Sequence, residues 1–178
     1  MKVRSEQLPQ SLFFTILLLL ALEIVASTFF PIIGLVRFRP AFNILIVLYV
    51  GFKLETPFVA LVIFAIQYFH SFFSVEGWAA GTFAGIIICM IISYLREMIH
   101  FSTALVTIVV VEIFQIIWFI IASLLLYLKT DNITYVYEKF FRFIPESIII
   151  ALVAPYCFTI LDRIWHSRNE RKLLGDVS

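Results

Sequence analysis

The sequence predicts an all-α membrane protein, a six-transmembrane-helix bundle that forms one polytopic domain over residues 1–178. Three observations predict this fold class. Hydrophobic residues make up 62% of the chain and charged residues only 14%, and the mean hydropathy is +1.04. Water-soluble domains are only about half apolar. The apolar residues also gather in runs, several of them near the ~20 residues that cross a bilayer core.

The same composition argues against several classes of protein. The net charge is +1, so we expect no basic surface for nucleic acid. Three scattered histidines and two cysteines make no metal-ligand spacing, and we expect neither a metal nor a cofactor. Cys89 and Cys157 lie far apart inside apolar runs, which favours two small buried hydrophobes over a disulfide. The chain holds no nucleophile elbow, zinc-protease helix or phosphate-binding loop, so we expect no enzymatic activity.

Six apolar segments are separated by charged residues and turn signals. The first follows a short basic head, as a signal peptide would. However, it is long, it contains Glu23, and no cleavage pattern follows it, so we interpret it as a retained helix that Pro31 and Gly34 end. We expect the spans at approximately 11–30, 40–53, 58–73, 79–94, 102–127 and 147–165.

The second span is the weakest of the six. Pro40 suits the first turn of a helix, where its missing N–H is not needed. The apolar part that follows has only about a dozen residues, roughly 18 Å at 1.5 Å per residue. It would cross a bilayer only if Arg39 and Lys53 extend toward opposite surfaces.

The only sizeable loop is expected at 128–146, on the periplasmic side, before Pro145 starts the last helix. Its apolar residues recur at helical spacing, which suggests a short amphipathic helix in the outer interface or against a partner protein. An aromatic-rich loop anchored at the lipid headgroups fits equally well. The residues at this spacing are Ile133, Val136, Phe140 and Phe143.

The distribution of basic residues predicts that both termini are cytoplasmic, because cytoplasmic segments carry more Lys and Arg. With this orientation the cytoplasmic residues are Lys2, Arg4, Lys53, Arg96, Arg163, Arg168, Arg171 and Lys172, and those outside are Arg37, Arg39, Lys129, Lys139 and Arg142. The remaining segment, 166–178, is then a cytoplasmic tail.

A ladder of glycines marks the expected contact between the third and fourth spans. Gly77, Gly81 and Gly85 recur every four residues, a spacing that removes side-chain bulk from one stripe of a helix and lets a neighbouring helix approach closely. Just before the ladder, Gln67 and His70 share one helix face. Two interpretations of this polar pair stay open, helix packing and the lining of a pocket.

Two carboxyl groups lie near the middle of apolar spans, where they are costly. Glu23 is in the first span and Glu112 in the fifth, with Gln115 on a face similar to that of Glu112. A proton relay, a ligand contact and a hydrogen bond between helices are the three alternatives. Because no Lys or Arg lies within a span as a partner, we favour a hydrogen bond across a helix contact for each.

Three stretches, taken in order, resemble the rod shape-determining protein MreD family. The first is Arg39-Pro40 followed by Leu45 and Tyr49, similar to the Arg-Pro pair that opens the family's second span. The second is Val110-Val111-Glu112-Ile113, which resembles the acidic position of the fifth span. The third is Ala151-Leu152-Val153-Ala154-Pro155-Tyr156, similar to the proline-bearing last span before a basic tail. One feature differs: the family often has an Asp in its third span, where this chain has Gln67 or His70 nearby.

The resemblance implies a non-catalytic scaffold of the cell-elongation machinery in the bacterial inner membrane, which contributes to cell shape and lateral peptidoglycan synthesis. Relatives associate with the bitopic protein MreC, and through it with MreB and the RodA–PBP2 peptidoglycan synthase. Partner surfaces would then include Phe140 and Phe143 in the outer loop, besides the lipid bilayer itself.

The alternative is a substrate-binding S component of an energy-coupling factor vitamin transporter. S components are also six-span proteins of similar length. Such a protein would arrange polar side chains from several spans around one cavity. Glu23, Gln67, His70 and Glu112 are the side chains that this alternative would use.

Overall fold

The computed structural model describes residues 8–32, 34, 38–54, 57–74, 77–96, 98–99, 103–130 and 133–166. Within these ranges the chain forms six helices, as the hydropathy pattern predicts. They are α1 (Leu8–Ile32), α2 (Asn43–Lys53), α3 (Val59–Ser71), α4 (Trp78–Leu95), α5 (Ala104–Thr130) and α6 (Ile133–His166). Most of the expected basic head and of the expected tail at 166–178 lies outside the described residues.

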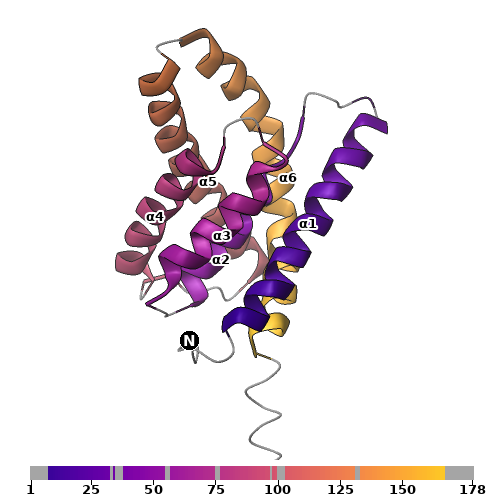
Figure 1. Ribbon diagram of the computed structural model, residues 1–178, viewed down its shortest axis with the longest axis vertical. Helices are drawn as coiled ribbons and strands as arrows, with labels where there is room; N and C mark the ends of the chain where they lie inside the picture. The colour runs from indigo at the N-terminus through magenta and orange to yellow at the C-terminus, as the bar shows by residue number, and fades with distance from the viewer. Residues whose placement is uncertain are drawn as a thin grey trace, which may run out of the picture.

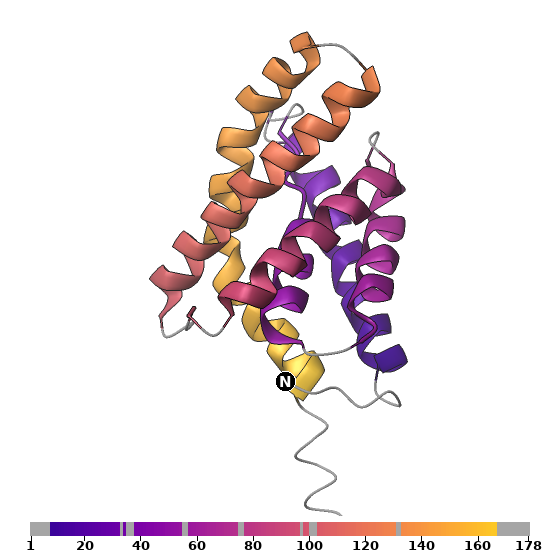
Figure 2. The same cartoon turned by 90° about the vertical axis from the view of Figure 1, so that its left-hand side faces the viewer.

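The six helices form one bundle whose first and last helices run in opposite directions. Figure 1 shows the first turn of α1 and the last turns of α6 at the same, lower end of the molecule. In Figure 2, α5 and α6 run side by side as a hairpin, and the end of α5 meets the start of α6 at the upper end. The first and last helical residues therefore lie at the lower end of the molecule. The end of α5 and the start of α6 lie at the upper end.

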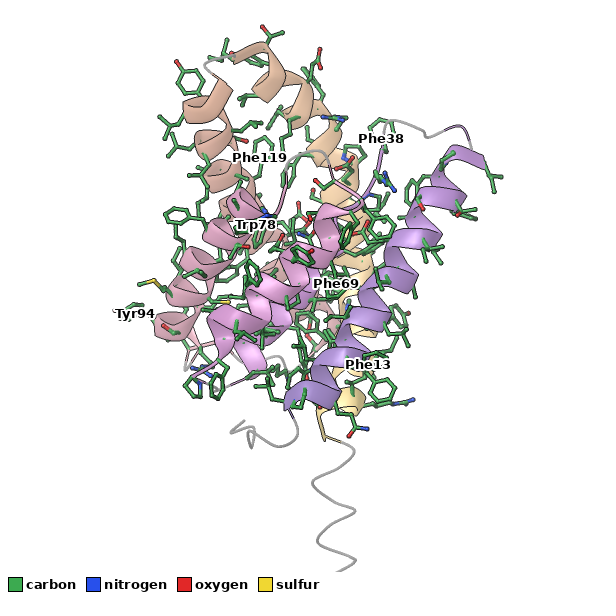
Figure 3. The ribbon with its side chains drawn as sticks, viewed as in Figure 1. Phe13, Phe38, Phe69, Trp78, Tyr94 and Phe119 are labelled. Atoms are coloured by element: carbon green, nitrogen blue, oxygen red, sulfur yellow. The ribbon has the colours of Figure 1, made fainter. Side chains whose placement is uncertain are left out.

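Four of the helices are long and apolar enough to cross a membrane. They correspond to Leu8–Ile32, Trp78–Leu95, Ala104–Leu128 and Val136–Trp165. Large apolar side chains on these helices point away from the bundle, among them Phe13 on α1 and Tyr94 on α4 (Figure 3). An apolar exterior of this extent is stable against lipid and not against water. The chain is therefore a multi-helix membrane protein.

The short helix α2 is the centre of the bundle. Every residue from Asn43 to Phe52 is buried, and α2 packs against each of the other five helices. This explains why its sequence is apolar on all sides, without a polar face. Because protein encloses α2, the thickness of the bilayer does not set its length, and 11 residues suffice.

The prediction of an outer loop at 128–146 is wrong. Helix α5 continues to Thr130 and α6 begins at Ile133, so most of this stretch is helical. The helical spacing of its apolar residues was a valid signal, but the helix is continuous with the last span and is not a separate amphipathic helix. Phe143 of α6 stacks on Phe119 of α5, with ring centroids 4.5 Å apart.

The prediction that Pro145 starts the last helix is also wrong. Pro145 lies inside α6, as does Pro155. A proline removes one backbone hydrogen bond, but in membrane helices neighbouring groups and local adjustments compensate for that loss. Packing on α5 keeps the segment before Pro145 helical, since the stacked Phe119 and Phe143 hold the two helices together on that side.

Candidate functional site

A cavity of about 500 Å³ lies in the upper half of the bundle, on the side of the α5–α6 turn. All six helices contribute to its wall, together with the segment that leads into α2 and the turn before α4. The lining includes polar, charged and aromatic residues and one glycine, namely Glu23, Arg39, Asn43, Gln67, His70, Gly81, Gln115, Trp118, Phe119, Lys139, Arg142, Phe143, Glu146 and Ser147. Half of them are residues that the sequence predicts to have a role, namely Glu23, Arg39, Gln67, His70, Gly81, Gln115 and Phe143.

Glycines shape one wall of the cavity. A Cβ atom at Gly81 would overlap the side-chain oxygen of Gln67 and lie 2.9 Å from its Cδ atom. The absence of a side chain on α4 therefore lets the Gln67 side chain of α3 lie directly against the α4 backbone. One turn further into the bundle, Gly85 is buried against Ile63, Trp118 and Val47.

The third glycine of the ladder has another role. Gly77 precedes α4, and no atom lies within 4 Å of where its Cβ would be, so it does not mediate helix packing. Its φ of +76° lies in the left-handed region, which favours glycine. Gly77 therefore turns the chain into α4, while Gly81 and Gly85 allow the close approach that the four-residue spacing predicts.

Three buried amides carry hydrogen-bonding atoms without partners. Asn43 Nδ2 donates to Gln67 Oε1 at 2.9 Å, and Gln115 Nε2 donates to the carbonyl oxygen of Ser147 at 3.3 Å. These bonds leave Asn43 Oδ1, Gln67 Nε2 and Gln115 Oε1 with no partner among the described residues. The three side chains are 3%, 1% and 0% exposed and all line the cavity. Unpaired polar atoms at this burial cost about 1–3 kcal/mol each.

An acid–imidazole contact closes the side of the cavity nearest α1. His70 Nδ1 lies 2.8 Å from Glu23 Oε1, and the Glu23 side chain is almost fully buried. The contact joins α1 to α3. The sequence analysis favoured a hydrogen bond across a helix contact for Glu23, and the structure places it in one, with a histidine as its partner. Gln67 and His70 both line the cavity, as the pocket interpretation of that pair requires.

Basic and aromatic side chains line the upper part of the cavity. Arg39, Lys139 and Arg142 lie there with one carboxylate, Glu146. Glu146 Oε1 accepts a hydrogen bond from the backbone N–H of Arg39 at 2.8 Å. Among the described residues that line this end, basic side chains therefore outnumber acidic ones. The stacked pair Phe119 and Phe143 adds an apolar wall, and Figure 3 labels Phe119 in the upper half of α5.

Glu112, the carboxyl residue of the fifth span, lies beside the cavity and does not line it. Ser147 Oγ donates to Glu112 Oε1 at 2.9 Å, and the carbonyl oxygen of the same serine accepts from Gln115. Glu112 and Gln115 thus both reach one residue of α6. Ser147 itself gave no signal in the sequence.

Three residues lie away from the cavity, two from the family-like stretches and one from the predicted partner surface. Tyr49 is fully buried, and its hydroxyl donates to Asp162 Oδ1 at 3.0 Å near the lower end. Pro155 lies within α6, and Phe140 is 45% exposed on the outer surface of that helix. Asn43 was missed as a site residue because it is separated from Gln67 by 24 residues, and no local spacing connects them.

The site is suited to recognition, since it combines amides, basic groups and aromatic rings around one cavity. Within the described residues no group of three or more His, Cys, Asp and Glu side chains could hold a metal ion. Comparisons with protein-family models, with curated proteins and with solved structures found no match to this chain.

Proposed function

We propose that this protein is a non-catalytic scaffold of the bacterial cell-elongation (rod) complex in the inner membrane. One observation supports the proposal above the others. Two of the three stretches that resemble the MreD family, around Tyr49 in α2 and around Pro155 in α6, lie in helices that are bonded to each other near both ends of α2.

At the lower end, Tyr49 donates to Asp162, and Lys53 Nζ lies 3.8 Å from the other oxygen of that carboxylate. At the upper end, the backbone N–H of Arg39, just before α2, donates to Glu146 of α6. Arg39 and Tyr49, both from the first family-like stretch, therefore help to fix the central helix to the last helix. Such a role fits a protein whose function is to present a defined bundle to its partners.

The surface of α1 fits a scaffold as well. Its buried residues form one narrow stripe, namely Ser11, Thr15, Leu19, Glu23 and Ala26. The rest of α1 presents large apolar side chains outward, including Phe13, Leu17 and Phe29. In a bilayer this surface is available to lipid and to the transmembrane helices of partner proteins, for which we propose an MreC-like bitopic protein and a RodA–PBP2-type synthase.

The proposed topology has six spans and two cytoplasmic termini. Helix α2 is enclosed by protein, and α3 has 13 residues, about 20 Å at 1.5 Å per residue. The flanking residues Phe58 and Phe72 extend the apolar length of α3. This topology puts the cavity on the periplasmic side. A cytoplasm-specific reporter fused after Ser178 should be active, and activity of a periplasm-specific reporter there would refute the topology.

The function is tested by depleting the protein in its native host. Loss of the protein should turn rod-shaped cells round, and expression of the wild-type chain should restore the rod. Affinity purification from native membranes should recover the bitopic protein and the synthase. Depletion that leaves cell shape unchanged, together with purification that recovers neither partner, would refute the scaffold.

The cavity favours a second function, that of a vitamin-binding S component. The observation behind it is the convergence of polar side chains from five of the six helices, all except α4, on one volume. The two functions differ in their readout. An S component predicts uptake of a vitamin by cells that depends on this protein, with cell shape unaffected by its loss, whereas the scaffold predicts the reverse.

A further inference from the structure

We propose that the cavity binds a water-soluble, anionic small molecule that also carries an amide, urea or nitrogen-heterocycle group. The anionic group would be held by Arg39 and Arg142 at the upper end, and the N–H and carbonyl groups by Asn43, Gln67 and Gln115 deeper in the bundle. This site goes beyond the scaffold function and would deepen the ligand-binding alternative, but it depends on neither.

The buried amides specify one half of the ligand. Together they offer two acceptors, Asn43 Oδ1 and Gln115 Oε1, and one donor, Gln67 Nε2, none of which has a described partner. A ligand that satisfies all three must contribute two hydrogen-bond donors, N–H or O–H, and one acceptor. Amides, ureas and heterocycles such as pyrimidinediones place such donors and an acceptor on one planar unit, whereas a hydrocarbon chain has neither.

The size and the walls of the cavity favour such a molecule over water alone. Its volume of about 500 Å³ lies within the range of about 300–1,000 Å³ that is usual for small-molecule sites. Trp118, Phe119 and Phe143 line it with aromatic surface, which offers a planar ring a stacking partner and offers water little.

The charges at the upper end specify the other half of the ligand. The ion pairs between described residues are Lys53–Asp162 and His70–Glu23, so none involves the guanidinium of Arg39 or of Arg142. The carboxylates are engaged elsewhere: Glu146 accepts the Arg39 backbone N–H, and Glu23 contacts His70. Guanidinium groups bind carboxylates and phosphates through paired hydrogen bonds, so the ligand's anion is of one of these two kinds.

The test uses the full-length protein, purified from native membranes into lipid nanodiscs. The bound small molecules are released by denaturation and identified by mass spectrometry, and their amount is divided by the amount of protein. Gln115→Met removes one amide at nearly constant volume, and Arg142→Gln removes one charge at the partly exposed end. Arg163→Gln is the control, because Arg163 is an exposed arginine of the same helix that does not line the cavity.

We expect wild-type protein and Arg163→Gln to hold an anionic compound of the proposed class in near-equal, substantial occupancy. Gln115→Met and Arg142→Gln should each lower this occupancy about tenfold or more, as the loss of a buried or charge-assisted hydrogen bond does. Should Gln115→Met fail to fold, as judged by gel filtration, Arg142→Gln decides the matter alone.

Three results would overturn the proposal. The folded wild-type protein could release only phospholipid or no compound at all. The compound could be neutral, with an occupancy that Arg142→Gln leaves unchanged. Both cavity variants could retain the compound as fully as the control does. Restoration of rod shape by the same variants is scored separately, so failure of the ligand site and failure of the scaffold function are distinguishable.

Discussion

Replacing Gly81 by alanine should destabilise the protein, although alanine is the better helix former. A Cβ atom there would overlap Gln67 Oε1 and lie 2.9 Å from Gln67 Cδ. The Gln67 side chain is buried, and its oxygen accepts a hydrogen bond from Asn43, so it can move toward the cavity only at the expense of that bond. The substitution must therefore displace Gln67 and weaken that bond.

The magnitude follows from three contributions. Overpacking a well-packed site costs about 1–3 kcal/mol, and losing the bond to Asn43 costs about 1 kcal/mol. The higher helix propensity of alanine returns about 1 kcal/mol. The net destabilisation of Gly81→Ala should be about 2 kcal/mol, and the larger Gly81→Leu should lower the yield of folded protein.

Testing Gly81→Ala also in protein that carries Gln67→Ala makes the prediction specific to the contact between these two residues. In Gln67→Ala protein the obstructing side chain is gone, so Gly81→Ala should then be neutral or stabilising by up to about 1 kcal/mol. The free energy of unfolding is measured for the four proteins of this double-mutant cycle, by titrating mixed micelles with a denaturing detergent. An equal cost of Gly81→Ala in both backgrounds would refute the contact with Gln67, and full stability of Gly81→Leu would show that this face of α4 meets lipid.

Two further predictions concern polar contacts between helices. Glu112→Gln should keep both fold and function, because the amide oxygen can still accept from Ser147; normal folding with loss of rod shape would show that Glu112 must ionise. Tyr49→Phe should lower the free energy of unfolding by about 1.5–3 kcal/mol, because it removes a hydrogen bond to the carboxylate of Asp162. Tyr156→Phe, at an exposed tyrosine, is the matched control and should change it by less than about 0.5 kcal/mol; equal effects of the two substitutions would contradict the Tyr49 prediction.

The helices of this protein were largely predictable, because apolar length is a signal within one segment. The span expected at 79–94 is α4, Trp78–Leu95, and the span expected at 11–30 is α1, Leu8–Ile32. The start of α6 was not predictable in this way. Pro145 satisfies the rule for a helix start, and only packing between Phe143 and Phe119 on α5 shows that the helix begins a dozen residues earlier.

The members of the cavity were predictable one by one, but their partners were not. A polar residue in an apolar span is conspicuous in any sequence, which is why Glu23, Gln67 and Gln115 were singled out. Periodicity then gives the helix face on which each lies. The partner lies on another helix, as His70 does for Glu23 and Asn43 does for Gln67, and the pairing depends on how the helices cross.

The location of the cavity follows from how α2 is packed along its length. From Leu45 to Val50 every side chain is fully buried, and a Cβ atom at Gly51 would lie only 3.0 Å from Cys89 Sγ and Ile92 Cδ1. The lower part of the bundle is therefore closely packed. Above Asn43 the chain leaves α2 through Pro40 and Arg39, so no helix fills the centre of the upper part, and side chains from the surrounding helices line the space instead. A central helix of 11 residues, too short to fill the bundle, is thus the structural cause of the cavity. Bulky apolar residues at Asn43 and Gln67 would have filled that space, and the amides found there keep it polar.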